Sequence, residues 1–157
     1  MPKDFFEIGV ADSFRPLAVR AKLPLRKVHD GVYEILGNEF AMRIRRGIGH
    51  GKDVLVTLSR KTDLSTDPLE IRGEVGLALF AEYAGATEEA ATLTARDGSP
   101  SAFRRVVEAA ERFCLPYLLG RRTDFAAVQQ FVHEKVENAR AGIKKYHFPP
   151  NVREEWT

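Results

Sequence analysis

The clearest pattern in the chain is the alternation of large apolar residues with an alanine and two arginines over residues 40–45. Phe40, Met42 and Ile44 are the apolar members, and the intervening positions are 41, 43 and 45, of which the last two are arginines. A period of two is typical of a strand with one face on a core. The pattern therefore predicts that positions 40, 42 and 44 face the core while the arginines face water.

Two neighbouring segments predict further strands. Residues 32–36 are Val-Tyr-Glu-Ile-Leu, which suit a pleated surface, and Gly37-Asn38 then provides a tight hairpin signal. After the glycine-spaced residues 47–51, residues 53–58 read Asp-Val-Leu-Val-Thr-Leu. Sequential strands with short connections predict a three-stranded antiparallel meander over residues 32–58.

Helical spacing of apolar residues marks both ends of the chain. A short N-terminal helix is expected from Asp12 or Ser13 to residue 23, where Pro24 ends it. A second helix is expected over residues 68–85, with Asp67 as its cap and Pro68 in its first turn, although two internal glycines allow an extended start. Residues 87–89 can open one or two short turns.

Two stronger amphipathic helices follow in the second half. The first starts at Ser99 or Ser101 and ends near Pro116, with an apolar stripe that runs from residue 103 to 114. The second starts at Thr123 or Asp124 and closes at Gly142, with apolar residues at 125, 128, 132, 136 and 139. Both are expected to supply the core opposite the sheet, and residues 143–157 are expected to form an irregular C-terminal arm.

These elements predict one α+β domain over residues 1–157: a short N-terminal helix and a three-stranded antiparallel meander, packed against C-terminal helices. The length of 157 residues and the apolar fraction of 44% suit a single globular domain. Because Cys114 is the only cysteine, an intramolecular disulfide is excluded. No apolar run is long enough for a membrane span or a signal peptide, so we expect a cytoplasmic protein without membrane contact.

Charge is segregated along the chain. Residues 42–61 carry six basic side chains against one acid, a net charge of +5, whereas residues 63–97 carry a net charge of −6. One interpretation is that the acidic stretch docks a basic partner protein. The other is that the two stretches neutralise each other within the fold. The partner-binding candidates are Asp67, Glu70, Glu74, Glu88 and Glu89.

The basic strand and the glycine-spaced connection after it form the other candidate site. Backbone N–H groups of such a connection, together with forked guanidinium donors, suit phosphate or carboxylate. The segment is not a nucleotide-binding phosphate loop, because Asp53 stands where Ser or Thr is required. A flexible connection without a ligand, or a contact with a partner protein, are the alternatives. The anion-binding candidates are Arg43, Arg45, Arg46, His50 and Lys52.

No constellation of residues points to catalysis, a metal or a cofactor. The four histidines lack metal-ligand spacing, and Cys114 lies on the apolar stripe of its helix, which indicates a core residue. We therefore assign no catalytic residue and no metal ligand. An enzyme using His50 as a general acid or base with the nearby arginines remains the less favoured alternative.

The layout of the chain resembles small, uncharacterised bacterial α+β families, some of whose members are immunity proteins encoded beside polymorphic toxins. The resemblance covers the N-terminal helix, the meander from Tyr33 to Leu58 and the helical half ending in Phe125 to Arg140, and it carries over no site residues. It implies a binding protein without an active site. The leading hypothesis is a non-enzymatic protein-interaction domain, and the alternative is a basic hairpin that binds nucleic acid or a phosphorylated ligand.

Overall fold

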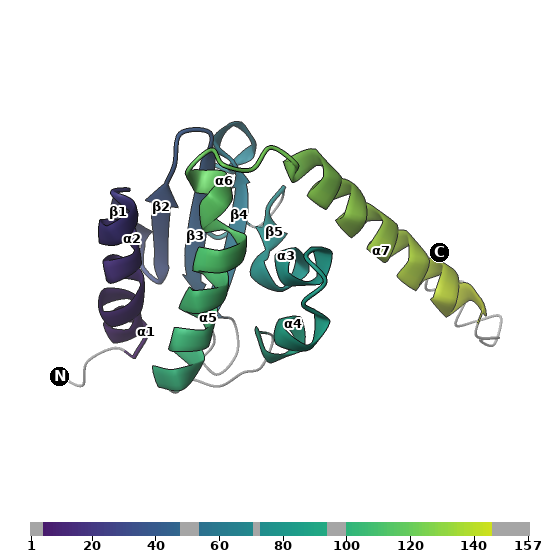
Figure 1. The fold of residues 1–157 in the computed structure, drawn as a ribbon, viewed down its shortest axis with the longest axis horizontal. Helices are drawn as coiled ribbons and strands as arrows, with labels where there is room; N and C mark the ends of the chain where they lie inside the picture. The colour runs from purple at the N-terminus through teal and green to yellow at the C-terminus, as the bar shows by residue number, and fades with distance from the viewer. Residues whose placement is uncertain (1–4, 48–53, 71–72, 94–99, 146–157) are drawn as a thin grey trace.

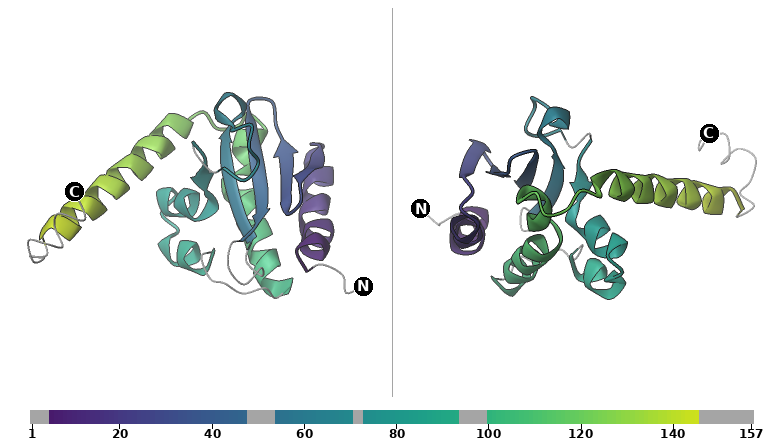
Figure 2. Two further views of the ribbon diagram at one scale, coloured as in Figure 1. Left: turned by 180° about the vertical axis from the view of Figure 1, so that it is seen from behind. Right: turned by 45° about the horizontal axis from the view of Figure 1, so that its top comes forward.

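The computed structural model describes residues 5–47, 54–70, 73–93 and 100–145. It confirms the predicted α+β class: helices cover one face of an antiparallel sheet (Figure 1). Seen from behind, the strands lie in front of the green helix of residues 100–113 (Figure 2, left). The sheet has five strands in the order β1-β2-β3-β4-β5, so every strand pairs with its neighbours in sequence.

The predicted meander forms the centre of this sheet. Its register places Ile44 opposite Tyr33 on one side and opposite Val56 on the other. The two edge strands were not predicted, because one is rich in charged residues and the other has only two residues. The strands are β1 (Leu25–His29), β2 (Val32–Leu36), β3 (Phe40–Arg46), β4 (Val54–Arg60) and β5 (Val75–Gly76).

Helices occur in each region of the chain where the sequence predicts one, but several of their bounds differ from the prediction. The N-terminal helical segment starts at Phe5, earlier than predicted, and contains one π-helical turn. The helix after the sheet begins only at Leu77, so it does not start at Pro68, and the alternative of an extended start is confirmed by β5. The elements are α1 (Phe5–Gly9), the π turn η1 (Val10–Phe14), α2 (Arg15–Ala21), the 3-10 turn η2 (Lys61–Asp63), α3 (Leu77–Tyr83), α4 (Thr87–Leu93), α5 (Pro100–Phe113), α6 (Leu115–Leu118) and α7 (Phe125–Lys145).

The apolar core lies between the sheet and the helices. Met42 and Ile44 are fully buried there, as the alternation on β3 predicts, and the apolar stripe of α5 packs in the same core. Gly37 allows α6 to approach the β2–β3 turn, because a Cβ atom at this position would lie 2.4 Å from the carbonyl oxygen of Leu118. The sheet is therefore anchored to α6 by a contact that no larger residue permits.

The opposite face of the sheet does not face water, contrary to the prediction for Arg43 and Arg45. These two residues are only 5% and 4% exposed. The chain from residue 61 to residue 70, which we call the strap, supplies hydrogen-bond acceptors to both arginines. Alternation alone cannot distinguish a solvated polar face from a covered one.

Helix α7 departs most from its expected role. Phe125 and Val128 are buried, but every residue from 133 to 141 is exposed, and Val136 is 45% exposed. The helix projects away from the body in all three views (Figures 1 and 2). The prediction that its apolar positions through residue 139 pack in the core was therefore wrong for the distal half. The helix also continues past Gly142 to Lys145, and residues 146–157 of the predicted C-terminal arm lie outside the described residues.

The substitution Ile44→Ala should lower the free energy of unfolding by about 2–5 kcal/mol, because it leaves a cavity at a fully buried position. Urea denaturation monitored by circular dichroism measures this change. The matched control is Val19→Ala on α2, where the side chain is 70% exposed. Equal effects of the two substitutions would contradict the assigned register of β3.

Candidate functional site

The strap is fixed to the sheet through the guanidinium group of Arg45. Its Nε donates to the carbonyl oxygen of Pro68 at 2.9 Å, and its Nη2 donates to the carbonyl oxygen of Glu70 at 3.1 Å. The two terminal nitrogens also form a forked pair with the Glu74 carboxylate, at 3.0 and 2.8 Å. Thr57 on β4 accepts from Nη1 and donates to Glu74, so every nitrogen of this guanidinium has a partner.

Arg43 makes a second connection on the same face. Its Nε donates to Glu34 Oε2 at 2.9 Å, and its Nη2 donates to the carbonyl oxygen of Ser65 in the strap at 3.1 Å. Glu34 is 2% exposed and also accepts from Arg26 on β1. Buried charges are tolerated only when paired and hydrogen-bonded. The two arginines therefore close the polar face of the sheet.

These contacts change the interpretation of the basic hairpin. Arg43 and Arg45 are buried and donate to acceptors of the fold itself, so they are not at the surface where an anion could reach them. The guanidinium of Arg46 lies over the ring of Phe6, 5.4 Å from its centroid. His50 and Lys52 lie outside the described residues. Anion binding by the five candidates stays a prediction.

The acidic candidates lie at three places: in the strap, just before β5 and on α4. In the strap, Asp67 accepts from the backbone N–H of Leu69, and Glu70 accepts from the Ser65 hydroxyl at 2.7 Å. Glu74 is inside the fold with Arg45, as described above. On α4, Glu88 is exposed, and Glu89 forms an ion pair with Arg112 at the surface, where the two side chains are 36% and 65% exposed, respectively. Asp67, Glu70 and Glu74 do not share a helix face, because residues 67–70 and 73–74 are not helical.

Part of the charge segregation is thus neutralised within the fold. Glu74 from the acidic stretch forms an ion pair with Arg45 from the basic stretch. This pair supports the second interpretation of the charge pattern for these two residues. Asp67 and Glu88 remain exposed.

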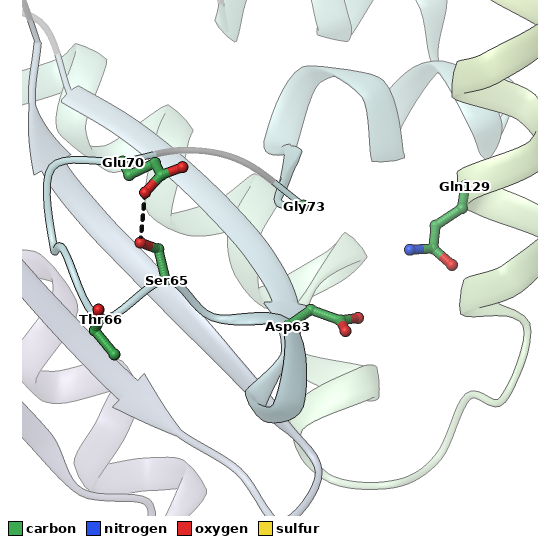
Figure 3. Close-up of a pocket in the computed structure, with 6 residues that line it drawn as sticks. All are labelled: Asp63, Ser65, Thr66, Glu70, Gly73 and Gln129. Atoms are coloured by element: carbon green, nitrogen blue, oxygen red, sulfur yellow. Dashed lines mark hydrogen bonds between the residues drawn. The ribbon is translucent and has the colours of Figure 1, made fainter.

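A polar hollow lies between the strap and the first turns of α7. Its volume is about 630 Å³, and it is open to solvent. Figure 3 shows the Asp63 and Gln129 side chains pointing toward each other, and the hydrogen bond between Glu70 and Ser65 among the other lining residues. The lining residues are Asp63, Ser65, Thr66, Glu70, Gly73 and Gln129. Sequence reasoning missed Asp63 and Gln129, because they carry no motif and meet only through the tertiary fold.

The start of α7 is fixed by one carboxylate. Asp124 accepts from Tyr117 on α6 at 2.7 Å, from Tyr83 on α3 at 3.0 Å, and from Arg122. The Arg122 guanidinium and these two hydroxyl groups hold the pKa of Asp124 well below its usual range. Buried rings of Phe40, Phe80, Tyr117 and Phe125 pack beside it. The direction of α7 is therefore set at its root.

The thiol of Cys114 and the possible metal ligands can be judged within the described residues. Burial raises the pKa of the Cys114 thiol, which opposes formation of the nucleophilic thiolate. Among the described residues, no group of three or more His, Cys, Asp or Glu side chains could hold a metal ion. In the same part of the chain, no helix is both long and apolar enough to cross a membrane.

No protein-family model, curated protein or solved structure matches this chain.

Replacing Glu74 by Ala should destabilise the protein by about 3–5 kcal/mol, because it leaves the Arg45 guanidinium buried without its charge partner. The matched control is Glu89→Ala, which breaks an ion pair at the surface and should cost about 0–1 kcal/mol. Chemical denaturation of both variants measures the difference. Similar small losses would show that Glu74 does not hold the strap.

The lowered pKa of Asp124 predicts a specific acid sensitivity. Because the unfolded-state pKa is about 3.9 and the folded-state pKa lies below it, the contribution of Asp124 is fully present above that range. It is lost as the pH falls through the folded-state pKa. The free energy of unfolding should therefore fall more steeply below pH ~4 in the wild type than in Asp124→Asn. Asp30→Asn, at a side chain 80% exposed, is the control and should keep the wild-type slope.

Proposed function

We propose that this chain is a non-enzymatic protein-binding domain that uses the distal half of α7 as its main contact surface. The observation that carries the proposal is the course of this helix: its root is anchored in the core, while residues 133–141 are exposed. A rigid helix that leaves the body offers a partner a preformed surface with little ordering cost. The resemblance to immunity proteins implies the same class of function.

The polarity of α7 supports a protein partner. Val132 is half-buried, and Val136, one turn further, is 45% exposed, so a narrow apolar stripe continues from the body onto the free part of the helix. Charged residues border this stripe, among them Lys135, which pairs with Glu82 on α3. An apolar stripe with a polar rim is the usual composition of a protein interface.

The nucleic-acid alternative has a narrower basis than the sequence suggested. It relied on five side chains around one hairpin, and two of them, Arg43 and Arg45, are occupied by carboxylates and carbonyl groups of the fold. Replacing them would disturb the strap before it affected any ligand. The protein-binding proposal needs neither residue.

A photo-crosslinking amino acid at position 136 tests the proposal, and the same label at position 19 is the matched control. Both positions are exposed valines on helices, but Val19 lies on α2, in the body. We expect one protein to crosslink from position 136 and not from position 19, and to bind the purified domain. Val136→Asp should then weaken that binding about tenfold or more while leaving the melting temperature unchanged.

Two results would reject this role of α7. One is equal crosslinking from both positions, and the other is a purified partner whose affinity is unaffected by Val136→Asp. Val19→Asp serves as the control in the second case.

A further inference from the structure

The hollow beside α7 presents hydrogen-bonding groups that the fold itself does not use. Among the described residues, none donates a hydrogen bond to the Asp63 carboxylate, and none pairs with the Thr66 hydroxyl or the Gln129 amide nitrogen. Gln129 Oε1 accepts from Arg60 Nη1 at 3.2 Å, which turns the amide nitrogen toward the hollow (Figure 3). The hollow therefore offers an acceptor with negative charge on one side and a neutral donor on the other.

Arg60 of β4 is not among the residues that line the hollow, so its charge does not pair with Asp63 there. Arg60 donates to Gln129, and its guanidinium carbon lies 5.0 Å from the centre of the Phe125 ring. It is thereby held against the root of α7. Lys61, the next residue, is exposed.

We propose that the hollow binds an arginine residue of the partner protein. The guanidinium group would donate to the Asp63 carboxylate, and a main-chain carbonyl of the same residue would accept from the Gln129 amide nitrogen. A planar fork of N–H donors matches carboxylates better than a single ammonium does. This assignment rests on the proposed function, since it places the partner across the strap and the adjoining helix α7.

The hollow suits an inserted side chain in shape as well as in charge. Its volume of about 630 Å³ and its open mouth leave room for a long side chain while the main chain of the partner stays at the rim. The Ser65–Glu70 hydrogen bond fixes this part of the lining before any ligand arrives. Such preorganisation reduces the entropy lost on binding.

A titration with a blocked amino acid tests this site without the partner. The probe is Nα-acetyl-arginine N-methylamide, and its neutral analogue, blocked citrulline, has nearly the same shape. We expect the arginine probe to shift the NMR signals of the Thr66 and Gly73 backbone amides and of the Gln129 side chain. Blocked citrulline should leave these signals unchanged, and blocked lysine should bind more weakly than arginine.

Asp63→Asn should raise the dissociation constant of the arginine probe about threefold to fivefold, as expected for one solvent-accessible charge pair. Glu88→Gln removes an exposed acid of α4 and is the matched control with no expected effect. Equal binding of citrulline, equal effects of the two variants, or shifts confined to α4 would overturn the assignment.

This experiment separates the hollow from the rest of the proposed interface. Val136→Asp should leave binding of the arginine probe unchanged, because residue 136 is not part of the hollow. Failure of the probe in the wild type would thus reject the arginine site while leaving the role of α7 to its own test. If Val136→Asp loses partner binding but still binds the arginine probe, both the role of α7 and the separate arginine site are supported.

Discussion

The ion pair between Arg45 and Glu74 is the contact on which the arrangement around the sheet depends. It joins the central strand β3 to the residue just before the edge strand β5, and Arg45 also holds two carbonyl groups of the strap. The contacts of Arg45 with Pro68, Glu70 and Glu74 thus hold the chain before β5 against the polar face of the sheet. Helix α3 accordingly starts only after β5.

The two faces of the sheet are closed by different physical means. The helix-facing side buries Met42 and Ile44 in an apolar core, whereas the strap side buries Glu34, Arg43 and Arg45 in ion pairs and hydrogen bonds. Burial of such pairs contributes less to stability than apolar packing, but each hydrogen bond fixes a direction. The strap is thus placed in one position on the sheet. Its outer side can then form a hollow of defined shape with Gln129 of α7.

Sequence reasoning was most accurate where the signal was local. The alternation on β3 predicted the core positions, and the apolar stripe from residue 103 to 114 predicted the packed face of α5, because both patterns repeat within one element. It was wrong where a distant residue decides the outcome. Arg45 looks like a solvated strand residue until Glu74, 29 positions away, is placed against it. The hollow could not be predicted for the same reason, since Asp63 and Gln129 become neighbours only when α7 takes its place beside the strap.

The contrast between the two ends of α7 explains how a long helix can remain largely uncovered. At its root, Asp124 and the buried ring of Phe125 connect it to the rest of the fold. Isolated helices shorter than roughly 12–15 residues are only marginally stable in water, and α7 has 21 residues. Exposed pairs along the helix, such as Gln130 with Glu134, add small contributions to its stability. The free half therefore keeps its helical form as a continuation of an anchored helix. A partner that binds it meets an ordered apolar stripe, and the hollow at the base of the same helix lies within reach of the same partner.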